Sequence, residues 1–197
     1  MAILYPIAAV ARLAAQSLVA SQPSAAGEVD WNTAPLPSLL DHLITRRHDY
    51  LRHEMPLLTE LVARVHRVYS VRHPGELDGL PQVFESLRAE LQSHLETEEL
   101  LLFPAIRLQV RDRETGAVAE PIGVGGLAQT IARMEYEHEG AEAAMRRIRE
   151  LTNGYAVPHY ACATYRALIL GLQALEADIR HHIHLENDIL HPRVLAL

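Results

Sequence analysis

Two stretches of the sequence place a histidine four residues before a glutamate. The first pair is His94 and Glu98, the second is His182 and Glu186, and both stretches follow H-[L/I]-x-x-E-x-x-[L/I]-L-x-P. On a helix, residues four apart lie on one face, about one turn apart. The imidazole and carboxylate of each pair could therefore reach one metal ion, or two neighbouring ions. Two such pairs would provide half of a dinuclear metal site.

Long segments with apolar residues three and four positions apart predict helices in most of the chain. The predicted helical segments are 38–72, 81–112, 125–152 and 159–191. Turn signals separate them at His73-Pro74-Gly75, at Thr115-Gly116, and between Asn153-Gly154 and Pro158. Four amphipathic helices joined by fairly short loops predict an all-α fold, an antiparallel up-down four-helix bundle.

Each predicted helix has an apolar stripe, and six polar residues interrupt these stripes. In chain order, the stripes are Ile44, His48, Leu51, Met55, Leu58, Val62, Val65 and Tyr69; Phe84, Leu87, Leu91, His94, Glu98, Leu101 and Ala105; Leu127, Ile131, Met134, His138, Ala141, Met145 and Ile148; and Leu168, Leu172, Leu175, Ile179, His182, Glu186 and Ile189. A buried carboxylate is costly unless it is paired or coordinates a metal. The candidate metal ligands are therefore His48, His94, Glu98, His138, His182 and Glu186.

The spacing of the four stripe histidines supports a common site. Successive histidines are 46, 44 and 44 residues apart, and the midpoints fall at or near the three turn signals. Residues equidistant from the turn of an antiparallel hairpin lie level with each other. The four histidines are therefore predicted to meet at one height, one from each helix.

Angular position separates these candidates from neighbouring polar residues. His184 and His181 lie about 200° and about 140° around the helix from Glu186, whereas His182 lies only about 40° away. The match to the first repeat also selects His182. His138 and Glu142 form a third H-x-x-x-E pair, but the proline tail is missing and Glu142 lies beside the stripe, so we interpret it as solvated or as an outer-sphere group.

The ligand types favour iron or manganese, and zinc would have less need of a second metal. Two metals about 3.5–4 Å apart can share a bridging oxo or hydroxo group. Open positions on such metals could bind a small diatomic, nitric oxide or oxygen. Apolar walls are predicted to exclude bulk water, and they comprise Leu91, Leu95, Leu101, Ile131, Met134, Ile179 and Ile183. No nucleophile–base pair or nucleotide motif competes, and Cys162 is interpreted as a buried packing thiol.

Composition limits the remaining functions. A chain of 197 residues has room for one ordinary domain, and its net charge is −7. Its single cysteine excludes internal disulfides and cysteine-based metal sites. The sequence has no basic stripe that would suggest a nucleic-acid partner. It also has no run of about 18 apolar residues that would suggest a membrane span. We divide the chain into an Ala-rich segment and linker, 1–35, and a main domain, 36–197. A short helix over 7–20 is preferred to an export signal, since no Lys or Arg precedes the apolar stretch and Arg12 interrupts it.

The two H-x-x-x-E segments, ending in LLFP and ILHP, resemble those of the hemerythrin-like di-iron proteins. More narrowly, HDYLRHEMP from His48, MEYEHE from Met134 and HIHLEN from His182 resemble the repair-of-iron-centres family. The resemblance covers about residues 36–197. It implies a hemerythrin-like bundle with two non-haem irons, in preference to manganese or zinc. By position it implies that His48, His94, His138 and His182 are terminal ligands, and that Glu98 and Glu186 bridge the metals.

Two departures from that family are visible. Its members usually begin with a small domain that bears a Cys-Cys-Gly-Gly motif, where this chain has only the Ala-rich segment. Many relatives have a further histidine late in the first helix, where this chain has Tyr69, with His66 nearby. About 31 Å of helix separates Tyr69 from His48, so Tyr69 is expected to pack in the core, and its loss to leave the metal site intact.

These features lead to three hypotheses. The first is a cytoplasmic di-iron protein of nitrosative or oxidative stress that binds or reduces nitric oxide, or supplies iron to damaged iron–sulfur client proteins. The repair role is implied by the resemblance alone. The second is a hemerythrin-like module that binds or senses oxygen or nitric oxide without turnover. The third is an interaction bundle that binds no iron.

Overall fold

The computed structural model describes residues 29–116 and 126–197, and every regular element in these ranges is helical. The predicted short helix over 7–20, and most of the predicted segment 1–35, lie outside the described residues. Within the part of the chain that is described, no helix is both long enough and apolar enough to cross a membrane.

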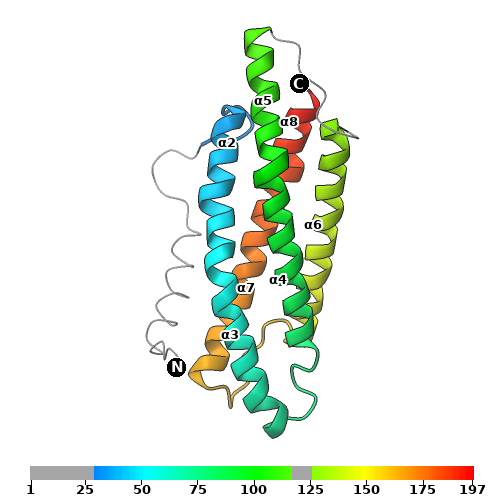
Figure 1. The fold of residues 1–197 in the computed structure, drawn as a ribbon. Coiled ribbons are helices and arrows are strands. Elements are labelled where there is room, and N and C mark those ends of the chain that lie inside the picture. The colour runs from blue at the N-terminus through cyan, green and yellow to red at the C-terminus, as the bar shows by residue number, and fades with distance from the viewer. Residues whose placement is uncertain (1–28, 117–125) are drawn as a thin grey trace, which may run out of the picture. The chain divides into compact units, whose positions relative to one another are not determined.

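The helices form four long stretches, three of which contain a short π-helical turn. Figure 1 labels the α-helices along the chain. The first stretch consists of α2 (Leu36–His42), the π turn η1 (Leu43–His48) and α3 (Asp49–Arg72). The second consists of α4 (Leu80–Thr97), η2 (Glu98–Leu102) and α5 (Phe103–Thr115), and the third is α6 (Gly126–Leu151). The fourth consists of α7 (Ala163–His184), η3 (Leu185–Leu190) and α8 (His191–Leu195). The predicted all-α, four-helix bundle is thus confirmed.

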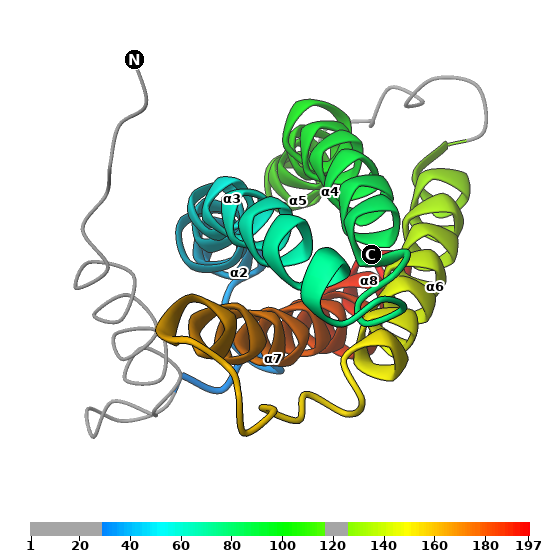
Figure 2. The ribbon, with the colours of Figure 1, turned by 90° about the horizontal axis from the view of Figure 1, so that it is seen from below.

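The described residues group into two compact units, each containing portions of all four stretches. The first unit contains His53–Leu87 and Ala143–Asp178, and the second contains Val29–Arg52, Arg88–Glu142 and Ile179–Leu197. Figure 2 shows the ribbon turned by 90° from Figure 1 and seen from below, with α3, α4, α6 and α7 labelled. Within each unit the stretches surround an apolar interior.

The first unit is built on close helix contacts and a cluster of tyrosines. A Cβ atom on Gly171 would come within 2.6 Å of Leu58 Cδ2, so the absence of a side chain lets these helices approach. The Tyr69 ring is buried, and its hydroxyl accepts a hydrogen bond from the Cys162 N–H at 3.0 Å.

Cys162 itself is exposed, because it lies in the loop that ends before α7. The prediction of a buried thiol was therefore wrong.

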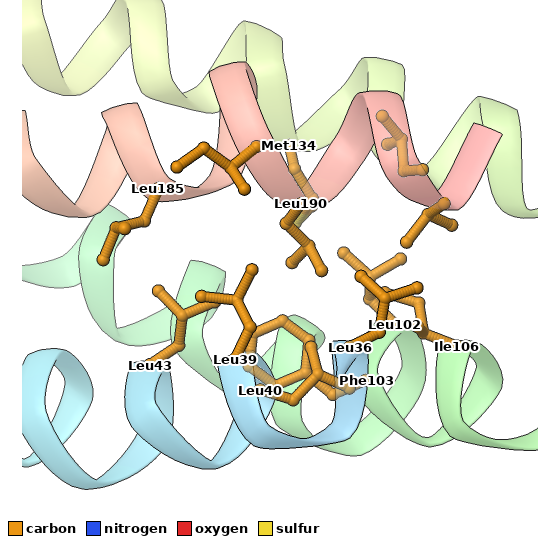
Figure 3. Close-up of a cluster of buried hydrophobic side chains, with 13 residues drawn as sticks. Leu36, Leu39, Leu40, Leu43, Leu102, Phe103, Ile106, Met134, Leu185 and Leu190 are labelled. Atoms are coloured by element: carbon orange, nitrogen blue, oxygen red, sulfur yellow. The ribbon is translucent and has the colours of Figure 1, made fainter. Parts of the chain in front are cut away.

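The second unit has a core of large aliphatic side chains (Figure 3). Leucines of α2 pack there with residues from the second and fourth stretches and with Met134 of α6. The buried members of this core are Leu36, Leu39, Leu40, Leu43, Leu102, Phe103, Ile106, Ile131, Met134, Leu185, Ile189, Leu190 and Val194. This core lies in the same unit as the six candidate ligands, and so provides part of the rigid frame around them.

The π turns shift two of the predicted apolar stripes by one residue. Leu101 was predicted to face the core and the metal site, but it is 64% exposed, whereas Leu102 is fully buried. In the first stretch Leu43 is fully buried and Ile44 only partly so. A π turn contains one residue more than an α-helical turn, so the side chains that follow are displaced around the helix axis. The prediction for Leu101 was wrong for this reason.

Candidate metal centre

The six predicted ligand residues lie together in the second unit, and all are buried. They come from all four stretches. His48 is the last residue of η1, and Glu98 is the first residue of η2. His94 lies in α4, His138 in α6, His182 in α7 and Glu186 in η3.

Glu98 is positioned between two groups of histidines. Its Oε2 atom lies 3.4 Å from His48 Nε2 and 4.0 Å from His182 Nε2. Its Oε1 atom lies 3.4 Å from His94 Nε2. One carboxylate oxygen therefore faces His48 and His182, and the other faces His94.

Glu186 has the same arrangement. Its Oε1 atom lies 2.8 Å from His182 Nε2, and its Oε2 atom lies 3.0 Å from His138 Nε2. The Nε2 atoms of His94 and His138 are 3.1 Å apart. Each glutamate thus offers one oxygen to each pair of histidines, which is the arrangement that two metals bridged by two carboxylates require.

The geometry defines two overlapping groups of possible ligand atoms, each spanning no more than 4.8 Å. The first group is His48, Glu98, His182 and Glu186, and the second is His94, Glu98, His138 and Glu186. Both groups contain both glutamates. We call the centres of these groups metal position 1 and metal position 2, in that order.

Several buried atoms of this cluster have no hydrogen-bond partner within the part of the chain that is described. They are His48 Nε2, both carboxylate oxygens of Glu98, and Oε2 of Glu186. Buried polar atoms are nearly always satisfied, and an unpaired buried carboxylate is especially costly. A pair of cations between these atoms would satisfy them, so the residues present fit a hemerythrin-type pair of non-haem irons.

The charge state of the cluster also suits metal binding. Burial lowers the pKa of His48 and of His94 to about 4, which keeps both imidazoles neutral near pH 7. Burial, together with the charge of Glu186, raises the pKa of Glu98 well above its usual value. Burial opposes ionisation of Glu186 as well, but His182 and His138 lower its pKa well below the usual value. Two adjacent buried carboxylates need positive charge if both are to be ionised.

Three of the histidines are fixed from outside by a hydrogen bond to Nδ1. His48 Nδ1 donates to Glu99 at 2.7 Å, and His94 Nδ1 donates to Glu137 at 2.9 Å. His138 Nδ1 lies 2.8 Å from the side-chain oxygen of Asn187. Such contacts hold the proton on Nδ1 and leave the Nε2 lone pair free for a metal, as is usual for metal-ligating histidines. Arg52 and Arg133 pair in turn with Glu99 and Glu137, each at 2.8 Å.

The competing polar residues lie away from the cluster. His181, His184 and Glu142 are exposed, and His184 pairs with Asp188 on the same helix. Tyr69 belongs to the first unit, and its buried ring agrees with the expected packing role. That its loss leaves the metal site intact stays a prediction.

Sequence reasoning missed the residues that surround the ligands. The residue after each glutamate, Glu99 or Asn187, contacts a histidine of another stretch. The residue five positions after each glutamate, Phe103 or His191, stacks on that same histidine. Because both relations repeat, comparison of the two H-x-x-x-E segments at these positions could have suggested them.

The π turns explain how two of these neighbours reach the cluster. The N–H of Phe103 donates to the Glu98 carbonyl, and the N–H of His191 donates to the Glu186 carbonyl, in each case five residues back. Pro104 and Pro192 follow immediately. A proline has no N–H to donate to the carbonyl four residues earlier, and its ring crowds that carbonyl. The proline that ends each repeat is therefore a local cause of the wider turn at the site, a common place for π turns.

Comparison with known proteins agrees with this geometry. The hemerythrin HHE cation-binding domain matches residues 39–194 of the chain. This defines the class of protein as a hemerythrin-like cation-binding bundle.

Similar proteins narrow the class further. The chain is 37% identical over 169 residues to the iron–sulfur cluster repair protein YtfE of Citrobacter koseri, a match that covers 86% of this chain and 70% of that protein. The YtfE proteins of Escherichia coli O81 and Escherichia fergusonii match with the same identity and coverage. The chain therefore belongs to the repair-of-iron-centres family of hemerythrin-like proteins, which confirms the resemblance seen in the sequence.

Proposed function

We propose that the six buried residues bind two non-haem irons. His48 and His182 would bind the iron at position 1, His94 and His138 would bind the iron at position 2, and Glu98 and Glu186 would bridge them. The observation that carries this proposal is the division of each carboxylate, with one oxygen toward each pair of histidines. The unpartnered buried atoms of Glu98 and His48 support it independently.

We propose that this centre serves the repair of iron–sulfur centres damaged by nitrosative or oxidative stress, in the cytoplasm. The support is the similarity to proteins named as iron–sulfur cluster repair proteins, over most of the chain. A pair of irons with open coordination positions would supply a place where a diatomic such as nitric oxide could bind, and the electrons for its reduction. Iron held there could also be supplied to iron–sulfur client proteins.

The chain's own residues would prepare the centre in three ways. Glu99, Glu137 and Asn187 hold three ligand histidines in the tautomer that presents Nε2 inward. Glu98 and Glu186, as bridging carboxylates, would keep the two positions close together. The buried side chains of Leu91, Leu95, Ile131, Met134 and Ile179 would provide apolar surroundings that exclude bulk water.

Exposure of the reduced, iron-loaded protein to nitric oxide tests the proposed activity. We expect about two irons per chain and the formation of nitrous oxide, measured by gas chromatography. A stable nitrosyl adduct without product would contradict turnover, and would indicate a hemerythrin-like binding or sensing module instead. Protein that takes up no iron would contradict both.

A further inference from the structure

The two halves of the centre differ at the residue five positions after each glutamate. In both repeats the π-turn hydrogen bond places this residue one turn beyond the glutamate, on the same face of its helix. In the first repeat it is Phe103, whose ring lies 5.6 Å from that of His48. In the second repeat it is His191, whose ring is nearly parallel to that of His138 at 6.2 Å. A polar imidazole thus lies beside position 2, whereas a phenyl ring lies beside position 1.

His191 has a hydrogen-bonding atom that the described protein does not satisfy. The side chain is fully buried, and its Nδ1 faces Oε1 of the half-exposed Glu135 at 3.3 Å. A carboxylate accepts, so Nδ1 carries the proton and Nε2 is left as an acceptor. Nε2 is buried and has no partner in the described part of the chain. A buried acceptor of this kind requires a donor.

Glu186 lies one helical turn before His191, on the same face of the fourth stretch. Its Oε2 atom faces His138 Nε2 and would be taken up by the metal at position 2. Nε2 of His191 would remain as an acceptor that needs a donor from outside the described protein. A water molecule can donate there, and buried waters typically bind about three polar partners.

We propose that His191 holds a water molecule, through Nε2, beside metal position 2. This inference rests on the proposed metal centre and assigns the two positions different roles. A small ligand that enters position 2 must displace the water and break its hydrogen bond to His191. Position 1 has no equivalent acceptor at this place, because Phe103 occupies it.

Azide titration of the diferric protein tests the inference. The variant His191→Phe gives the second repeat the residue that the first repeat has at this position. Azide has no hydrogen to donate, so it displaces the water without replacing the bond to Nε2. We expect His191→Phe to keep about two irons per chain and to bind azide about three- to tenfold more tightly, since the net value of one hydrogen bond corresponds to roughly that factor. The titration is followed by absorption spectroscopy.

Two further variants sharpen the result. His191→Gln keeps a side-chain acceptor and is expected to bind azide within about twofold of the wild type. His184→Phe makes the same change at an exposed histidine of the same stretch, and is expected to have no effect. If His191→Phe does not fold, His191→Leu removes the same acceptor.

The outcomes separate the two proposals. Azide affinity that is unchanged or weaker in the variant without an acceptor overturns the role of His191, even if iron is retained. Wild-type protein that binds no iron overturns the metal centre itself. Loss of thermal stability with unchanged azide affinity would show that His191 is only a packing residue.

Discussion

The histidines of the proposed centre differ in the groups that hold them. His48 and His94 each donate to a carboxylate that also pairs with an arginine, whereas His138 contacts the neutral Asn187. A carboxylate partner increases the basicity of an imidazole more than a neutral amide does. Each metal position therefore has one histidine held by a carboxylate, and the two positions differ in the wall residues Phe103 and His191.

Replacement of Glu137 by glutamine tests the effect of the outer carboxylates. The new side chain would be neutral and would no longer form an ion pair with Arg133, so His94 would become a weaker ligand. We expect Glu137→Gln to lower metal affinity about tenfold, as for other such outer residues. Competition with a chromophoric chelator measures this affinity.

The matched control is Glu139→Gln, which makes the same change at an exposed position on the same helix. Equal affinities in the two variants would contradict a role for Glu137 in positioning His94.

At the scale of helices, the centre depends on departures from regular α-helix. The sequence predicted four helical stretches and the face of each, because the 3-4 apolar pattern follows α-helical geometry. In α6, which is α-helical throughout, the stripe from Ile131 to Ile148 is buried as predicted. The pattern failed at Leu101 because the η2 turn contains an additional residue. The prolines of the two repeats indicate the π turns η2 and η3, but η1 has no proline at the corresponding place.

The shift of register at η2 can be measured through stability. Leu102→Ala would leave a cavity in the core, and we expect it to lower the free energy of unfolding by ~2–5 kcal/mol. Leu101→Ala changes an exposed side chain and should alter it by only about 0.5 kcal/mol or less. Chemical denaturation of the two variants makes the comparison. A larger loss of unfolding free energy in Leu101→Ala would indicate the regular α-helical register and would contradict the π turn.

For the molecule as a whole, the candidate site could be predicted in outline from residue type and spacing. The near-equal separation of His48, His94, His138 and His182 was sufficient to suggest that four helices meet at one level. Which oxygen faces which histidine could not be predicted, because it depends on side-chain rotamers and on the π turns. The place of His191 beside the cluster could not be predicted either, because in the sequence it is simply another histidine before a proline.

Iron content in variants of the two glutamates tests the paired centre most directly. We expect about two irons per chain in the wild type and in Glu142→Leu, which alters an exposed residue of α6. Glu98→Leu and Glu186→Leu should lose the paired site and the absorption bands of a bridged ferric pair. Full retention of two irons in Glu98→Leu and Glu186→Leu, or equal loss in all three variants, would contradict the assignment of the bridges.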